Sequence, residues 1–168
     1  IGHRNPQGLF YKKKKDLIIN TEHGPKGGDE VNLNFLKKNE TLPNFGWDIA
    51  SYGTPYENIK DPYKKSHSKY GFIEPFKNYT PAIGISEVVN ISKKDNINGK
   101  YNTLYVSSLR AGSIYMLETD KDLTKIISED RLFFKEQRLR DLEYDSELNV
   151  FFILFGYTPS IGVLRHLN

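Results

Sequence analysis

The chain has 168 residues, of which 38% are hydrophobic and 27% are charged, and its formal net charge is +3. This length suits one domain with a sizeable core, and the composition is that of an ordinary soluble protein. No run of about 18 or more apolar residues occurs, which excludes a membrane-spanning helix. The absence of cysteine excludes disulfides and thiolate metal sites. So small a net charge identifies no class of partner.

The first ten residues, IGHRNPQGLF, gather polar side chains around a proline and two glycines. Pro6 and the flanking glycines disfavour a helix here. One interpretation is a solvated loop. The other is a loop that presents the guanidinium of Arg4 and the amides of Asn5 and Gln7 to an anionic ligand. Because the chain begins with Ile1 and shows no signal-peptide pattern, we expect it to be a piece of a longer protein.

Strand patterns dominate the rest of the chain, because short runs rich in β-branched and aromatic residues recur between turn residues. Helical periodicity is nearly absent. The lysines at 12–15 are interpreted as the exposed tip of a hairpin rather than as a nucleic-acid site, since lysine keeps such a tip soluble. The predicted strands cover residues 8–11, 16–22, 29–34, 82–91, 103–110, 113–120, 125–134, 138–145, 150–156 and 162–167.

A second polar cluster, TEHGPKGGDEVNL, follows the second predicted strand. Proline lacks an N–H and glycine lacks a side chain, so the turn at Gly24 and Pro25 can direct main-chain carbonyls outward, and carbonyl oxygens suit Ca²⁺. The alternative is an ordinary turn that precedes a solvated acidic pair, Asp29 and Glu30. The pattern alone favours this alternative.

Strand patterns stop between residues 39 and 81, where proline, glycine, tyrosine and asparagine are frequent. Such a long irregular stretch is uncommon in a compact domain and is usually functional. Trp47 and the tyrosines near it are candidates for a sugar subsite, although a packed aromatic residue is the commoner outcome.

Arginines mark the strands of the second half. Arg138 and Arg140 are two residues apart in QRLRDL, so on a strand they point to the same face. Two neighbouring guanidiniums either face water or hold a ligand with several carboxylates or phosphates. Arg110 is predicted to end its strand on the same face as Val106 and Ser108. Spacing alone favours solvated arginines.

The predicted strands form hairpins that turn at 111–113 and at 145–149. Many short antiparallel strands are typical of a sandwich, a barrel or a propeller. With four strands in each blade, about ten strands would make roughly two and a half propeller blades. No repeat of fixed period separates these alternatives.

The order of the motifs does separate them. GHRNPQGL, EHGPKGGDEVN, SLR and RLRD, closing on GVLRHL, resemble the C-terminal half of the soluble aldose sugar dehydrogenases, the glucose/sorbosone dehydrogenase family of pyrroloquinoline quinone (PQQ) enzymes. The segments NFGWDIASYG and PAIGISEV are also similar. The resemblance covers the whole chain, so residues 1–168 are identified as the C-terminal part of such a domain. It implies an all-β fold, a partial propeller of about two to three four-stranded blades from a six-bladed quinoprotein glucose dehydrogenase type.

The resemblance also implies roles for the first two clusters. Arg4 and Asn5 would reach the quinone oxygens of PQQ, Arg4 would also be catalytic, and Gln7 would support the loop. Gly24 and Pro25 would give main-chain carbonyls to the Ca²⁺ that binds the quinone. A tricarboxylate quinone needs donors at its reactive carbonyls, and polar loops on rigid strands supply them.

The arginines of the second half receive the remaining roles in this resemblance. Arg138 and Arg140 would pair with the carboxylates of PQQ. Arg110 stands where some members carry lysine, which also suits a carboxylate but with different geometry.

The implied activity of the whole protein is oxidation of the anomeric hydroxyl of an aldose to a lactone, with electrons passed to an unidentified acceptor. The family's general base is a histidine of the N-terminal half, so His3, His23 and His67 are expected to be structural or loop residues, and the fragment alone is expected to be inactive. The resemblance implies a periplasmic or secreted location. The alternative is a non-catalytic propeller that binds a carbohydrate or a protein.

Overall fold

The computed structural model describes residues 1–36, 42–57, 62–92 and 102–165. The chain divides into two units, Ile1–Ile85 and Ser86–Asn168. Within the described ranges no helix is long and apolar enough to cross a membrane.

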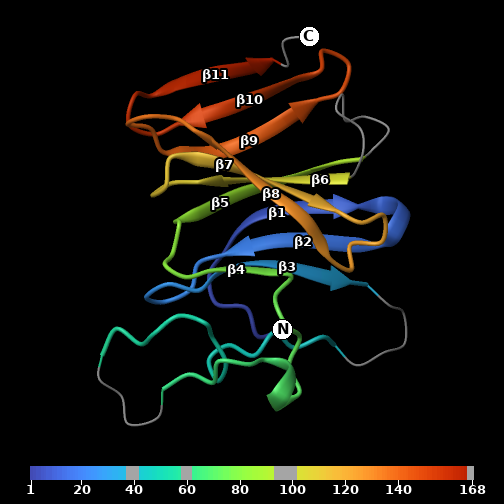
Figure 1. Ribbon diagram of the computed structural model, residues 1–168, viewed down its shortest axis with the longest axis vertical. Coiled ribbons are helices and arrows are strands. Elements are labelled where there is room, and N and C mark those ends of the chain that lie inside the picture. The colour runs from blue at the N-terminus through green and yellow to red at the C-terminus, as the bar shows by residue number, and fades with distance from the viewer. Residues whose placement is uncertain (37–41, 58–61, 93–101, 166–168) are drawn as a thin grey trace. The chain divides into compact units, whose positions relative to one another are not determined.

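The first unit contains one four-stranded antiparallel sheet (Figure 1). Its strands follow the chain order β1 (Pro6–Lys12), β2 (Leu17–Glu22), β3 (Asp29–Phe35) and β4 (Lys77–Tyr79). The first three were predicted. The sequence did not indicate β4, because three residues are too few to show an alternating pattern.

The lysines at 12–15 do form a hairpin tip, as predicted. A short 3₁₀ helix, Lys13–Lys15, joins β1 to β2 and contains no buried residue. Asp16 then adopts a left-handed conformation with φ of 49° and accepts a hydrogen bond from the hydroxyl of Tyr11 at 2.8 Å. Aspartate tolerates this conformation better than most residues, so the tip closes here.

The two faces of this sheet differ in chemistry. Residues of one parity, such as Leu17, Ile19 and Val31, are completely buried and apolar. Residues of the other parity are buried and polar, and they form cross-strand pairs between β2 and β3. These pairs are Asn20 with Asn32 and Glu22 with Glu30. Buried polar groups need partners, so the side chains that cover this face determine whether it is stable.

An irregular region follows β3, as predicted. Its described residues form no strand before β4, only a 3₁₀ turn, Ser68–Tyr70, and two isolated bridges. The carboxylate of Glu74 holds the second part of the region together. It accepts hydrogen bonds from the hydroxyl of Tyr52 at 2.8 Å and from the backbone N–H of Ser68 at 2.8 Å.

The second unit contains a four-stranded sheet in the order β5 (Ile85–Ile91), β6 (Asn102–Ser108), β7 (Ser113–Thr119) and β8 (Ile126–Phe133). All three pairs are neighbours in the chain order. The first residue of β5, Ile85, belongs to the first unit. The hairpin between β6 and β7 turns just before Ser113, as predicted.

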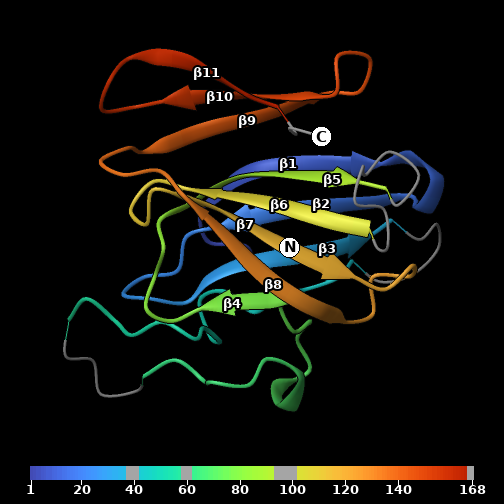
Figure 2. The same cartoon turned by 45° about the horizontal axis from the view of Figure 1, so that its top comes forward.

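A three-stranded sheet completes the second unit, in the order β11 (Ser160–Arg165), β10 (Val150–Phe155) and β9 (Leu139–Asp145) (Figure 2). The last two residues of the tenth predicted strand lie outside the described residues. Leu139 and Ile153 are buried, at 0% and 2% exposure.

Within the second unit, the two sheets pack through specific contacts. The hydroxyl of Ser86 donates a hydrogen bond to the carbonyl of Leu139 at 2.6 Å. The rings of Tyr105 and Phe151 lie 4.6 Å apart. The described chain is therefore all-β, with sheets of three or four antiparallel strands that follow one another in sequence, which is the blade pattern of a propeller.

Candidate functional site

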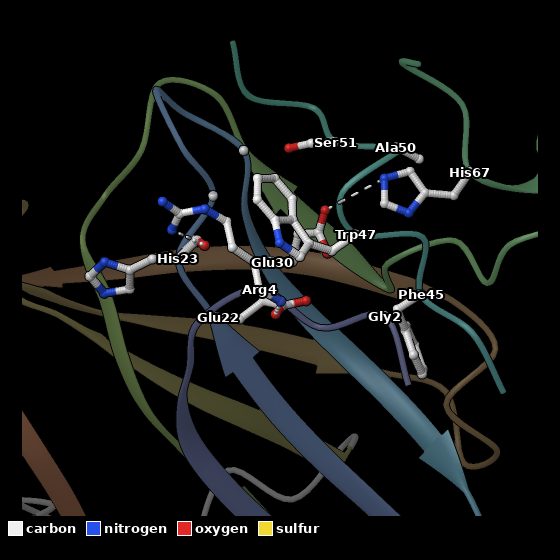
Figure 3. A pocket seen from close by; sticks show the side chains of 12 residues that line it. Gly2, Arg4, Glu22, His23, Glu30, Phe45, Trp47, Ala50, Ser51 and His67 are labelled. Carbon is white, nitrogen blue, oxygen red and sulfur yellow. Dashed lines mark hydrogen bonds and ion pairs between the residues drawn. The ribbon is translucent and has the colours of Figure 1, made fainter. Parts of the chain in front are cut away.

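A small pocket lies within the first unit, beside the polar face of its sheet (Figure 3). Its lining comes from the N-terminal segment, the end of β2, the following turn, β3 and the irregular region. The residues that matter below are Arg4, Glu22, Gly24, Glu30, Trp47 and His67.

Arg4 is held in place on three sides. Its backbone N–H donates to Glu22 Oε2 at 2.7 Å, and its Nη1 donates to the carbonyl of His23 at 3.1 Å. The guanidinium carbon lies 5.2 Å from the ring centroid of Trp47, and the two side chains lie next to each other in Figure 3. The Nε of Arg4 is buried and has no partner in the described part of the chain. An N–H left unpaired in a pocket is a donor available for a ligand.

Two carboxyl groups, those of Glu22 and Glu30, line this pocket. The amide of Asn32 donates to Glu22 Oε1 at 2.8 Å and to Glu30 Oε2 at 3.2 Å. Burial raises the pKa of Glu30 to about 8, and the nearby carboxylate of Glu22 adds to this increase against the opposing hydrogen bond from Asn32. Near neutral pH this pair therefore carries fewer than two negative charges.

His67 is the unexpected member of the pocket. The sequence placed it in a loop, but its exposure is 1% and its ring stacks on Tyr52 with centroids 5.3 Å apart. Its Nε2 lies 3.6 Å from Glu30 Oε1, too far for a hydrogen bond. Neither ring nitrogen has a hydrogen-bond partner among the described residues.

The predicted calcium turn borders the same pocket through Gly24. Asp29 closes the turn, because its carboxylate accepts from the N–H of Gly24 at 3.2 Å and from the N–H of Ile85 at 3.0 Å. Asp29 and Glu30 are 1% and 6% exposed, so the alternative of a solvated acidic pair is wrong.

The main-chain carbonyls of Gly24 and Pro25 differ in how far they are available to a hard cation such as Ca²⁺. No described residue donates a hydrogen bond to the carbonyl of Gly24, which leaves that oxygen available. The carbonyl of Pro25 accepts a hydrogen bond from the hydroxyl of Tyr56 at 2.8 Å, which leaves it one further lone pair.

Asn5 lies at the exposed side of the Arg4 loop and does not line the pocket. The amide of Gln7 donates to Asn5 Oδ1 and to the carbonyl of Pro6, both at 3.0 Å. Gln7 thus holds the loop from within, in agreement with the support expected of it.

His3 and His23 have the contacts of structural residues. His3 Nδ1 lies 3.2 Å from Glu22 Oε1, its Nε2 lies 3.1 Å from Asn34 Oδ1, and its ring stacks on Phe45. His23 Nε2 lies 2.6 Å from the carbonyl of Ile85. Both histidines have partners within the first unit.

The arginine pair lies in the second unit. Arg138 and Arg140 flank the buried Leu139 at the start of β9, and both lie beside Gly156. A Cβ at Gly156 would come within 2.8 Å of Arg140 Nε and 3.4 Å of Arg138 Cβ. The absent side chain therefore makes room for Arg140.

Neither arginine of the pair contacts a carboxylate of the described chain. The guanidinium carbon of Arg138 lies 5.7 Å from the ring centroid of Tyr157, and its Nε is buried without a described partner. Arg140 is exposed. Two adjacent, unneutralised guanidiniums are suited to an anion with several charges.

Arg110 differs from its prediction in one respect. Strand β6 ends at Ser108, so Arg110 lies in the exposed bend before β7 rather than at the end of the strand. Glycine and serine residues of the hairpin cause the strand to stop early. None of the described residues pairs with Arg110.

Sequence reasoning missed Glu22, Glu30 and His67. A signal for the two carboxylates exists, since polar residues at 20, 22, 30, 32 and 34 share one parity on two strands that pair. For His67 the sequence holds no such signal, because the irregular region places it by tertiary contacts alone.

The glucose/sorbosone dehydrogenase family model matches residues 1–156. The chain belongs to this family. Quinoprotein glucose dehydrogenase B of Acinetobacter calcoaceticus is 29% identical, and the match covers 92% of this chain and 41% of that protein. The chain spans only 34% to 41% of the length of the curated relatives it matches.

Solved structures show the fold. The soluble aldose sugar dehydrogenase of Escherichia coli, in its apo-form, matches with a TM-score of 0.76 and 24% identity over 98% of this chain and 46% of that one. The PQQ-bound aldose sugar dehydrogenase of Streptomyces coelicolor matches with a TM-score of 0.60 and 19% identity over 90% of this chain and 37% of that one. The chain is therefore a partial β-propeller of the quinoprotein glucose dehydrogenase type.

Proposed function

We propose that the whole protein is a PQQ- and calcium-dependent dehydrogenase that oxidises the anomeric hydroxyl of aldose sugars to lactones. Its family and the names of its relatives support this reaction class. The observation that carries the proposal for this chain is Arg4, a guanidinium fixed in a pocket with a buried and unpaired Nε. Such a donor is costly to bury unless a ligand accepts from it.

In this proposal Arg4, from the pocket, and Asn5, from the exposed side of the same loop, donate to the quinone oxygens, and Arg110, Arg138 and Arg140 hold the carboxylates of PQQ. The residues present suit an anion, because the guanidiniums of these four arginines have no carboxylate partner in the described chain. Gly24 and Pro25 hold Ca²⁺ through their carbonyls. The free carbonyl of Gly24 supports this role, while the hydrogen bond from Tyr56 to Pro25 leaves that carbonyl a weaker ligand.

When bound, PQQ with its calcium supplies the acceptor for the hydride that leaves the sugar. The residues of this chain prepare that step. Arg4 would offer its positive charge to the quinone oxygens, where negative charge would develop, and the contacts with His23 and Trp47 hold the guanidinium in its orientation. Glu22 orients the backbone at Arg4. The general base that removes the hydroxyl proton is a histidine outside this chain.

Further features of the whole protein follow the same proposal. Its location is periplasmic or secreted, and its reduced cofactor passes electrons to an acceptor that this chain does not identify. The second candidate is a binding propeller without catalysis. The arginines at 4, 138 and 140 favour the enzyme, because a cofactor with several carboxylates and quinone oxygens gives all three guanidiniums a common partner.

The test uses the full-length protein, purified and reconstituted with PQQ and Ca²⁺. We expect glucose-dependent reduction of a redox dye, lost on treatment with EGTA and restored by added Ca²⁺. PQQ binding without dye reduction by any aldose would contradict the reaction but not the cofactor. Absence of PQQ binding would contradict both and would favour the binding propeller.

The fragment gives a complementary prediction. Residues 1–168 alone should not oxidise sugars, because loss of a general base typically costs ~10²- to 10⁴-fold in rate. The same dye assay on the purified fragment measures this. Turnover near that of the full-length protein would mean that a histidine of this chain is the working base.

A further inference from the structure

The proposed calcium turn packs directly against a second backbone segment, Ser51–Thr54. Lys26 and Thr54 exchange two backbone hydrogen bonds, at 3.1 and 3.0 Å. A Cβ at Gly28 would lie 2.2 Å from the N of Gly53, and a Cβ at Gly53 would lie 2.4 Å from the carbonyl oxygen of Gly27. No side chain separates the two backbones, so the turn cannot move without the segment.

Lys65 holds that segment in shape. Its Nζ donates to the carbonyls of Ser51 at 3.2 Å and Tyr52 at 3.3 Å, and also to the carbonyl of Gly53. An ammonium has three N–H donors, and three successive carbonyls accept from it. The chain bends at residues 52 and 53, so these three carbonyls converge instead of alternating as they would in a strand, and the ammonium offsets the repulsion between their oxygens.

The backbone next to Lys65 is anchored to the same segment. The N–H of Ser51 donates to the carbonyl of Lys64 at 3.0 Å, and the N–H of Lys64 donates to the carbonyl of Ile49 at 3.0 Å. The backbone that carries this side chain is therefore already ordered, so only the side chain of Lys65 has to be fixed for its ammonium to reach the carbonyls.

We propose that Lys65 is a positioning residue for the calcium turn: its ammonium locks the carbonyls of Ser51, Tyr52 and Gly53, and this segment in turn fixes the carbonyls of Gly24 and Pro25. The inference rests on the proposed calcium role of the turn. In this account the ammonium of Lys65 is a second cation, supplied by the chain itself, that supports the proposed Ca²⁺ site. Lys65 acts through the backbone and touches neither the metal nor the substrate.

The test compares Lys65→Met with Lys69→Met in the full-length protein. Both lysines are exposed and both variants lose one positive charge, but the ammonium of Lys69 makes no hydrogen bond within the described residues. Calcium affinity is measured by isothermal titration in the presence of PQQ. Lys65→Met should weaken it by about 10-fold or more, as supporting contacts of metal sites do, and Lys69→Met should leave it unchanged.

A readout without metal separates the inference from the calcium proposal. In EGTA, the amides of Lys26 and Thr54 should exchange hydrogen about 10-fold faster in Lys65→Met than in the wild type. Unchanged exchange would overturn the inference whatever the metal does. Faster exchange in a protein whose wild type binds no calcium would overturn the calcium role and uphold the clamp.

Chemical rescue separates positioning from a general loss of stability. In Lys65→Ala, methylammonium should restore calcium affinity because it brings both the charge and the N–H donors. Tetramethylammonium at the same concentration has the charge without the donors and should not. Equal effects of the two salts would overturn the proposed hydrogen-bonded clamp.

Discussion

Arg4 in the first unit and Arg140 in the second are both proposed to hold one cofactor, but the fold treats them in opposite ways. Arg4 is fixed by the carbonyl of His23, the indole of Trp47 and the carboxylate of Glu22. Arg140 is exposed and has no partner in the described chain. The first arginine is oriented without a ligand, whereas the second, under the proposal, would be ordered by the cofactor. Removing Arg4 should therefore affect stability and binding, and removing Arg140 should affect binding alone.

The largest effect on stability should come from a change in the first unit, at the turn next to Arg4. In Gly24→Ala the new Cβ would lie 2.1 Å from the carbonyl oxygen of Gly27 and 2.4 Å from that of Gly28. Backbone atoms cannot yield as a side chain does, so we expect the free energy of unfolding to fall by about 4 kcal/mol. Urea denaturation of the full-length protein measures this.

The matched control for that change is Gly71→Ala, where a Cβ would meet nothing within 4 Å. Gly71 has a φ of 82°, so alanine there should cost only about 1 kcal/mol through backbone strain. Equal losses in the two variants would contradict the close packing of the turn.

Arg4→Ala comes next. It removes the charged hydrogen bond to His23 and the contact with Trp47, so the free energy of unfolding should fall by about 3 kcal/mol without any cofactor. Arg140→Ala should change it by less than about 0.5 kcal/mol, as exposed sites usually do. Thermal denaturation of both apo-proteins checks the difference. Similar midpoints of thermal unfolding in the wild type and in both variants would contradict the distinction between the two arginines.

Arg140→Ala should weaken the binding of PQQ rather than lower the stability of the protein. Loss of a charge-assisted hydrogen bond should weaken PQQ binding by ~1.5 to 3 kcal/mol, while sugar affinity changes less. Arg138→Ala should behave in the same way. Equilibrium titration of PQQ measures the first quantity and the Michaelis constant reports the second. If both affinities decline together, the pair has a structural role.

The smallest effect concerns pH. Because the pKa of Glu30 rises from 4.5 to about 8 on folding, the folded state holds this proton more tightly. The stabilisation is complete below pH 4.5 and is lost as the pH rises towards 8. Glu30→Gln stays neutral throughout, so its stability should fall by about 2 kcal/mol less between pH 6 and pH 8.

Urea denaturation at several pH values tests this, with Glu147→Gln, an exposed residue of a hairpin turn, as control. Glu147→Gln should follow the wild-type profile. A Glu30→Gln profile parallel to the wild type between pH 6 and pH 8 would mean that Glu30 is already ionised at pH 6.

The sequence predicted the strands well, because alternation and turn residues are local properties. It predicted ten of the eleven strands of the described chain and both later hairpins, but missed β4, whose three residues pair only because β3 is adjacent. Motif order identified the family and the fold. Trp47 was considered for a sugar subsite, and the structure places it against Arg4.

The parts that escaped prediction depend on contacts distant in the chain. His67 is buried by Tyr52 and approaches Glu30, which lies 37 positions earlier, and the ammonium of Lys65 reaches carbonyls at 51–53. Irregular segments have no periodicity from which such contacts can be read. The raised pKa of Glu30 likewise follows from burial that only the assembled loops provide.

The most direct test of the central claim is a PQQ titration of the full-length protein and three single variants, Arg4→Ala, Arg140→Ala and Arg131→Ala. Arg131 serves as control because Ser113 and the carbonyl of Ala111 already accept from its guanidinium, at 2.7 and 2.9 Å. If one cofactor is held by arginines of both units, Arg4→Ala and Arg140→Ala should each weaken PQQ binding by about 10-fold or more, and Arg131→Ala should not. Unchanged affinity for PQQ in Arg4→Ala or in Arg140→Ala would contradict the proposal that both arginines hold one cofactor.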